Sequence, residues 1–192
     1  DRVTRKTEPV YLAGSSVAER LTRETGFSSL LSILFSDAVM CVQQARGRNV
    51  PAGLFDRGQR RPLVAGASAK AILAYLPMHQ LRTLYARHAA AIEAVGLGAD
   101  WEAFKASLRR IRQAGHASSL GDYNPGIASV AAPIFNRDHE VLGSVALVAS
   151  VAHTPPEVLA RVAPQVMQAA HEISARIAAE AAVTALPARA LG

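Results

Sequence analysis

Three residues with the side-chain types of a nucleophilic triad, His116, Asp122 and Ser129, lie close together in the sequence. In such a triad the histidine accepts the serine proton and the acid orients the histidine, which requires a fixed geometry. The segment "GIASVA" around Ser129 lacks the glycine that follows the serine in a nucleophile elbow. Chance co-occurrence explains the three residues better than catalysis does, and we predict that the protein is not an enzyme.

The sequence also contains no motif for binding a metal or a cofactor. The six histidines form no HxH or HxxxH pair, and the single cysteine, Cys41, stands in an apolar run where a small buried thiol is expected. The sequence has no phosphate loop and no dinucleotide fingerprint. We therefore expect no cofactor and no metal.

Two stretches combine a bend of small residues with a regular apolar element. "PLVAGASAKAILAYLP" bends at Gly66 before a helix, and "GDYNPGIASVAAPIF" bends at Gly121 and Gly126 before a strand. Small residues let a ligand or a backbone approach closely. The pattern alone leaves two interpretations open, because the bends are either two ordinary turns or the two rims of a cavity.

These stretches need a scaffold, and apolar residues at helical spacing predict part of it. A first helix is expected to begin at or just after Pro9. Asp100 is placed to cap a later helix that ends at Gly115, and the segment "RHAAAIEAVGLG" before that helix is expected to be partly loop. A long C-terminal helix is expected to fray after Ile177.

Strands are predicted in two pairs. Two runs rich in β-branched and apolar residues about Ser36 and Asp37 predict a hairpin. "IASVAAPIF" and "VLGSVALVAS" are nearly all apolar, which predicts adjacent central strands covered on both faces. The order helix, hairpin, helices, hairpin, helix predicts an α+β fold, with an antiparallel sheet flanked by helices.

Composition places the chain among ordinary globular domains. It has 192 residues, 50% of them hydrophobic, and a net charge of +6 that is spread over small groups of arginines. No basic stripe with interleaved aromatic residues suggests a surface for nucleic acid. The apolar runs are shorter than the roughly 20 residues of a membrane span. With one cysteine, we expect a cytoplasmic protein without a membrane partner.

At the two bends the chain resembles the effector-binding domain of IclR-type transcriptional regulators. The family pattern "PLhaTAxGKAlLAxLP" is similar to "PLVAGASAKAILAYLP", and the family pattern "iRxxGya…GExxxGvxsiAaPvfdxxgxvvaalsvsGP" is similar to the segment from Ile111 to Ser150. The hairpin segment "LTRETGFSSLLSILFSDAVMCVQQARG" also looks like the corresponding part of the family. The resemblance keeps its order from about Pro9 to Ile177.

The resemblance implies a GAF/profilin-like domain that binds a small organic effector. It also implies homodimers or homotetramers, and contact with DNA only through an N-terminal winged helix-turn-helix domain that is absent from this chain. On this basis we expect residues 1–9 to be the remnant of an inter-domain linker, residues 10–180 to be the effector-binding domain, and residues 181–192 to be a frayed tail.

The resemblance also implies an effector site. Ser129 takes a position that is often Ser or Cys in the family, and Asp122 replaces a glutamate and either contacts the ligand or braces the turn. Ala146 and Val148 replace two frequent serines, so a less polar effector is expected, an aromatic or short aliphatic acid. The expected effector-binding residues are Gly66, Ala67, Ala69, Asp122, Ser129, Ala131, Ala146 and Val148.

Two alternatives to a ligand-sensing regulatory domain stay open at this point. One is a small-molecule enzyme that uses Asp122 or His116 as an acid-base group, and it would need turnover. The other is a dimerisation module without a ligand, in which protein side chains fill the predicted cavity.

Overall fold

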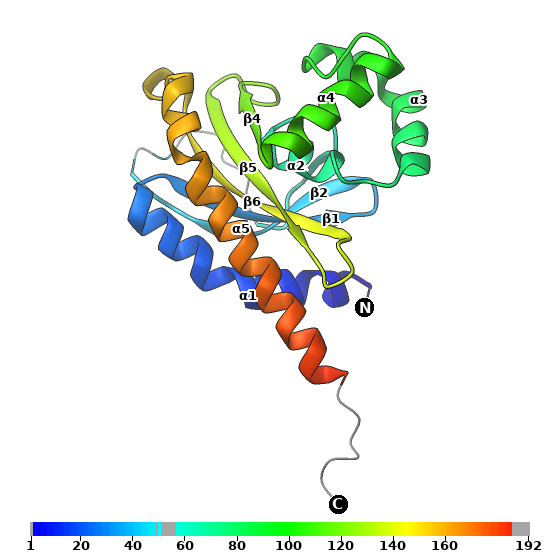
Figure 1. The fold of residues 1–192 in the computed structure, drawn as a ribbon. Coiled ribbons are helices and arrows are strands. Elements are labelled where there is room, and N and C mark those ends of the chain that lie inside the picture. Colours follow the sequence, from blue (N-terminus) through cyan, green and yellow to red (C-terminus); the bar gives the residue numbers. More distant parts are fainter. Residues whose placement is uncertain (1, 49, 51–56, 186–192) are drawn as a thin grey trace, which may run out of the picture.

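A single antiparallel sheet organises the computed structural model, which describes residues 2–48, 50 and 57–185 (Figure 1). Within these residues the sheet has six strands in the order β3-β2-β1-β6-β5-β4. The strands are β1 (Ser28–Phe35), β2 (Ala38–Ala45), β3 (Arg60–Pro62), β4 (Ala117–Leu120), β5 (Ile127–Phe135) and β6 (Val141–Ser150). The predicted α+β class is confirmed.

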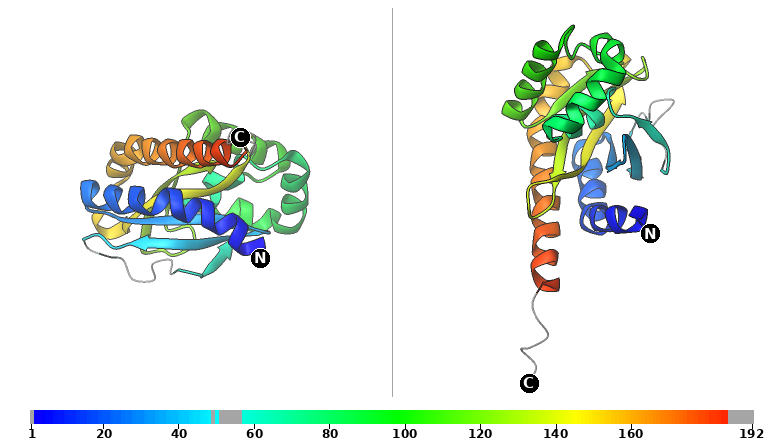
Figure 2. Two further views of the ribbon diagram at one scale, coloured as in Figure 1. Left: turned by 90° about the horizontal axis from the view of Figure 1, so that it is seen from below. Right: turned by 90° about the vertical axis from the view of Figure 1, so that its right-hand side faces the viewer.

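Helices cover both faces of this sheet. Helices α1 and α5 run beside each other and pack on one face (Figure 2), and helix α2 packs on the other face against β4, β5 and β6. The described helices are α1 (Arg2–Thr25), α2 (Ala67–Leu73), α3 (Met78–Ala94), α4 (Trp101–Ala114) and α5 (Pro156–Thr184), with a short 3-10 turn at Val151–His153. The sheet is therefore the middle layer of three.

Strand alternation divides the apolar residues between two cores. Along β6, Val145 and Leu147 belong to the core under α1 and α5, whereas Ala146 and Val148 belong to the core on the side of α2. Strand β5 is buried along almost its whole length. The prediction that these two segments are adjacent antiparallel strands, covered on both faces, is confirmed.

Local signals in the sequence account for several element ends. The hairpin predicted about Ser36 and Asp37 is formed by β1 and β2. The Asp100 carboxylate accepts a hydrogen bond of 2.8 Å from the amide of Ala103, as expected for the cap of α4. Gly115 ends that helix, as predicted.

Two predicted boundaries, the start of α1 and the end of α5, were wrong. Helix α1 begins at Arg2, before Pro9, and the prediction missed this start because the mostly polar residues ahead of the proline form no apolar stripe. The prediction that the segment "RHAAAIEAVGLG" is partly loop is confirmed, because α3 continues through it only as far as Ala94, with a kink at His88, and the following residues lie outside the helix. Helix α5 continues past Ile177 to Thr184, and residues 186–192 of the predicted tail lie outside the described residues. The proposed domain limits stay a prediction.

None of the helices in the described part of the chain combines the length and apolar character that crossing a membrane requires.

Candidate functional site

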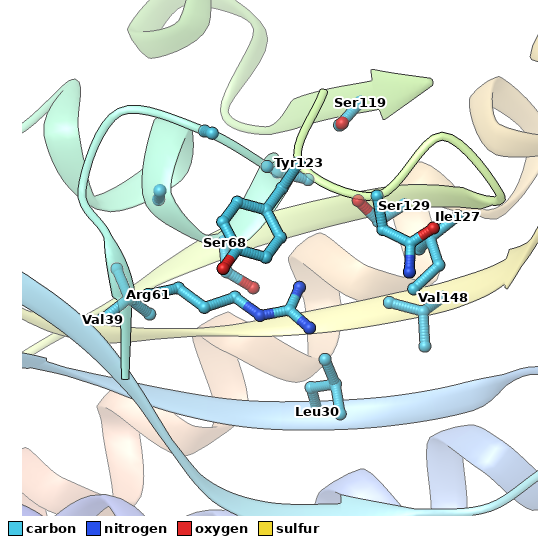
Figure 3. Close-up of a pocket in the computed structure, with 14 residues that line it drawn as sticks. Leu30, Val39, Arg61, Ser68, Ser119, Tyr123, Ile127, Ser129 and Val148 are labelled. Atoms are coloured by element: carbon cyan, nitrogen blue, oxygen red, sulfur yellow. The ribbon is translucent and has the colours of Figure 1, made fainter. Parts of the chain in front are cut away.

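A pocket lies on the α2 side of the sheet, where the loop before α2 meets the loop between β4 and β5 (Figure 3). Its floor is apolar and comes from Leu30 on β1, Ile127 on β5 and Val148 on β6. The two bends singled out in the sequence therefore border one and the same cavity. Its volume is about 40 Å³, which is room for roughly three water molecules.

Three side chains form a row across neighbouring strands at this pocket. Ser119 on β4 pairs with Ser129 on β5, and Ser129 pairs with Val148 on β6. All three are buried and line the pocket. The row gives the wall two hydroxyl groups followed by one apolar side chain.

The next row along the strands consists of alanines. Ala117 pairs with Ala131, and Ala131 pairs with Ala146. These three residues are buried in the core cluster that also contains Ala67 and Ala69 of α2. Small side chains let α2 approach the sheet closely, so this row lies beneath the helix and not in the pocket wall.

The loop before α2 places backbone close to the cavity. Gly66 has a φ of 91°, and a Cβ at this position would meet no atom within 4 Å. Residues with a Cβ rarely adopt this φ, which explains the glycine. Space alone would allow a larger residue. The carbonyl of Gly66 accepts a hydrogen bond from the amide of Lys70 at 3.0 Å.

An ion pair connects the two rims beside the pocket. Lys70 of α2 contacts the carboxylate of Asp122, which follows β4, and both side chains are largely buried, with 10% and 15% of their surfaces exposed. The Lys70 Nζ also donates to the carbonyl of Val95 at 3.3 Å. The amide of Asp122 donates to Ser119 Oγ at 3.3 Å. Asp122 thus braces its turn and is not among the lining residues of the pocket.

Arg61 and Tyr123 close the pocket, and neither was predicted. The Arg61 guanidinium lies 4.5 Å from the centre of the Tyr123 ring. Figure 3 shows the Arg61 side chain running beneath this ring, with its guanidinium toward Leu30 and Val148. Arg61 directly precedes the "PLVAGASAK" stretch, and Tyr123 lies in the "GDYNPG" turn. The only signal in the sequence for Arg61 and Tyr123 was their position next to the two motifs.

The structure brings most of the predicted effector-binding residues to one place. Gly66, Ala67, Ala69, Ser129 and Val148 line the pocket. Ala131 and Ala146 lie in the core beneath α2, and Asp122 lies beside the pocket in its ion pair with Lys70. Binding of an effector by any of these residues stays a prediction.

The three triad-type residues do not meet. Ser129 lines the pocket, whereas His116 lines a separate depression that contains Lys70, and its Nδ1 lies 3.2 Å from the carbonyl of Ala114. Asp122 pairs with Lys70. Across residues 2–48, 50 and 57–185, no three His, Cys, Asp or Glu side chains come together as metal ligands would.

The fold and the pocket define a class of protein: an α+β domain with a small cavity between two loops on one face of its sheet. Residues 6–175 match the family described as "Bacterial transcriptional regulator IclR C-terminal". The chain therefore belongs to the IclR family of transcriptional regulators and contains its C-terminal domain, as the resemblance in the sequence predicted.

Related sequences carry the names of regulators. The HTH-type transcriptional regulator BhcR of Paracoccus denitrificans is 30% identical over 156 residues, which are 81% of this chain and 56% of BhcR. The HTH-type transcriptional regulator XynR of Escherichia coli is 25% identical over 154 residues, which are 80% of this chain and 61% of XynR. The chain thus spans about three fifths of these relatives, and their names point away from an enzyme.

Solved structures show the same fold. The C-terminal domain of a putative transcriptional regulator from Vibrio cholerae superimposes with a TM-score of 0.71 at 26% identity, over 83% of this chain and 93% of that domain. The IclR structure from Thermotoga maritima gives a TM-score of 0.77 at 19% identity, over 88% of this chain and 68% of that one.

Proposed function

We propose that this chain is the ligand-sensing domain of a transcription regulator and that it binds a small organic effector in the pocket between the Gly66 loop and Ser129. The observation that carries the proposal is the meeting of both small-residue bends around one cavity over the sheet. Membership of the IclR family supports the proposal, because a regulatory domain can respond to a signal molecule only by binding it.

The lining supports an effector with an apolar body and one polar end. Leu30, Ile127 and Val148 offer no hydrogen bonds, whereas Ser119 and Ser129 offer hydroxyl groups on one side. A polyhydroxy ligand would lose water without replacement against the apolar floor. An aromatic or short aliphatic acid fits this division best.

The effector would act through a DNA-binding winged helix-turn-helix domain outside this chain. Binding changes DNA affinity only if the effector prefers one arrangement of the whole protein over another. A preference of about 1.4 kcal/mol shifts that balance tenfold. The names of the relatives as HTH-type regulators support this partner.

Isothermal titration of benzoate, phenylacetate, butyrate and valerate into the 192-residue chain tests the proposal. We expect at least one acid to bind with one site per chain. The variant S129L places a leucine in the small cavity and should abolish this binding while the circular dichroism spectrum stays unchanged.

The matched control is S118L. Ser118 is the exposed neighbour of Ser119 on β4 and does not line the pocket. This variant should bind the acid as the parent does. If S129L bound the acid as tightly as the parent, the assignment of the site would be wrong. If no acid in the series bound to the parent, the proposed class of effector would be wrong.

A further inference from the structure

A second cavity lies between α5 and the end of β5. We call it the α5 groove, and its lining includes Pro133 and Phe135 of β5 and Met167 and Ala178 of α5. It has no lining residue in common with the pocket at Ser129. Its volume is about 400 Å³, against about 40 Å³ for that pocket, and falls within the roughly 300 to 1,000 Å³ of known ligand sites.

The groove follows a stretch of sheet edge that no strand covers. β4 pairs with β5 only from Ala128 to Ala131, so within the described residues the rest of β5 has no strand on that side. The amide of Phe135 on this edge donates to Ser174 Oγ of α5 at 3.0 Å. Pro133, two residues earlier and therefore on the same edge, has no amide hydrogen. Because the edge offers no free backbone donor to an added strand, the groove suits a small molecule better than an extended peptide.

The walls of the groove are largely apolar. Met167, Ala175 and Ala178 lie on one stripe of α5, and Met167 is 36% exposed. The other wall contains Tyr75 and Phe135, whose rings meet edge to face with their centroids 4.9 Å apart. At 1.5 Å per residue, the stripe from Met167 to Ala178 is roughly 16 Å long. A long, narrow apolar wall of this kind can bury an alkyl chain that lies along α5.

The permanent positive charge of the groove lies at one end. β5 and α5 run side by side in the same direction (Figure 1), and Phe135 at the end of β5 bonds to Ser174. The turn that follows Phe135 therefore lies beside the last part of the stripe and brings Arg137 and His139 to the groove. Met167 lies at the opposite, apolar end.

No acid of the lining balances this charge. Asp and Glu are absent from the described lining residues, and Asp138 and Glu140 of the same turn lie outside the lining. The Glu140 carboxylate accepts a hydrogen bond of 2.8 Å from Asn136. Within the described residues Arg137 forms no ion pair. A cation at the end of an apolar groove favours a ligand with an apolar body and a negative end.

We propose that the α5 groove is a second ligand site, which binds an alkyl carboxylate of medium chain length with its chain along α5 and its carboxylate at Arg137. This proposal does not depend on the effector proposed for the pocket at Ser129. It predicts that affinity rises with chain length, because each added methylene is buried against the apolar walls.

The test compares butyrate, hexanoate and octanoate in isothermal titrations with the whole chain, and 1-octanol serves as the neutral probe. Each added methylene should tighten binding about twofold to fourfold, the upper value being that for complete burial. R137M should weaken octanoate binding about threefold, as expected for a charge at the surface, and should leave octanol binding unchanged. R161M removes an exposed arginine of α5 outside the groove and should bind both probes as the parent does.

A175W tests the groove itself, because it places a large side chain on the stripe of α5. It should weaken octanoate binding at least about tenfold, through loss of the buried chain. A179W is the matched control, since Ala179 is exposed on the same helix and does not line the groove. This variant should bind octanoate as the parent does, and so should S129L. If A175W does not fold, A178W takes its place.

Full octanoate binding by A175W, or equal losses in A175W and A179W, would overturn the proposal. Affinity that does not rise with chain length would overturn it as well. Loss of octanoate binding in S129L would place this acid in the pocket at Ser129 and remove the second site. A change of oligomeric state in A175W and not in A179W, measured by sedimentation, would show that a second copy of the chain covers the groove. Octanoate binding that survives in S129L would support the groove even if the effector proposed for the pocket were wrong.

Discussion

The contact between Lys70 and Asp122 ties the helix at one rim of the pocket to the loop at the other rim. Both side chains are mostly buried, so removing one partner leaves the other charge with little water around it. We expect K70M and D122N each to lower the free energy of unfolding by about 2 kcal/mol. Urea denaturation followed by circular dichroism measures this change.

The double variant K70M/D122N separates this pair from ordinary packing. Since the second substitution removes a charge that the first has already left unpaired, the double variant should be less destabilised than the sum of the single variants. Losses that add within about 0.5 kcal/mol would show that the two residues do not act as a pair.

Single residues also mark the limit of prediction from this sequence. Gly66 and Ser129 were placed at a cavity by their motifs, and both line it. Arg61 was not predicted, because its segment is rich in glycine and proline and gives no periodicity. Only its pairing with Val39 on the neighbouring strand turns it toward the pocket. Ala146 was predicted in the pocket wall, but α2 covers the row of alanines to which it belongs. The alternation of side chains along a strand reveals the face of the sheet, but not which residues on that face a helix covers.

At the scale of elements, the amino end of α4 depends on one side chain. Asp100 accepts the hydrogen bond from Ala103 that satisfies a free amide of the first turn. D100A should therefore lower the free energy of unfolding by about 1 kcal/mol. D100N keeps a side-chain oxygen and should stay close to the parent in the same urea titration, and a loss in D100N equal to that in D100A would contradict the cap.

Helices α1 and α5 are joined by a cluster of charges around Glu172. Arg20 of α1 contacts the Glu172 carboxylate, and Arg176 donates to it at 2.8 Å. The hydrogen bond from Arg20, with help from the charges of Arg20 and Arg176, lowers the pKa of Glu172 below its ordinary value of 4.5. The folded protein therefore holds the Glu172 proton less strongly than the unfolded chain does.

A carboxyl group whose pKa is lowered on folding stabilises the protein above its unfolded pKa, and this contribution is lost as the pH falls through its folded pKa. E172Q cannot titrate. Its stability deficit relative to the parent should be complete near neutral pH and should shrink as the pH falls below about 4.5, the ordinary value. Urea midpoints across this range measure it.

The control for this pH series is E180Q, on the exposed face of the same helix. It should show a smaller difference from the parent at every pH. A deficit in E172Q that stays constant down to acid pH would show that the variant acts through packing and not through the charge of Glu172.

Elements with strong periodicity or an end signal were predicted well, and those without one were not. The apolar runs of β5 and β6 and the cap of α4 have local causes, so the sequence reveals them. Helix α3 continues through alanines that carry no stripe, and the kink at His88 has no signal in the sequence. The helical residues before Pro9 are polar except for Val3 and likewise give no pattern. Pairing of β1 with β6, far apart in the chain, could not be derived from periodicity at all.

At the scale of the whole molecule, the sheet lies between the pocket and the two long helices. Val148 of the pocket wall pairs with Ser28, and Ser28 begins the strand that follows α1. Val148 is thus one strand away from the end of that helix. The pocket wall is thus connected to the end of α1 through the backbone of one neighbouring strand.

The same arrangement predicts how an effector changes the stability of the entire domain. A ligand that binds only the folded state stabilises it by about 2.7 kcal/mol when present at about 100 times its dissociation constant. For a domain of this size, this stabilisation should raise the melting temperature by roughly 5 to 10 °C. Differential scanning calorimetry with the tightest-binding acid of the series should show this rise in the parent and in S118L, and none in S129L. A rise of equal size in S129L would mean that the acid binds elsewhere on the molecule, because that variant fills the pocket while leaving the other surfaces of the fold intact.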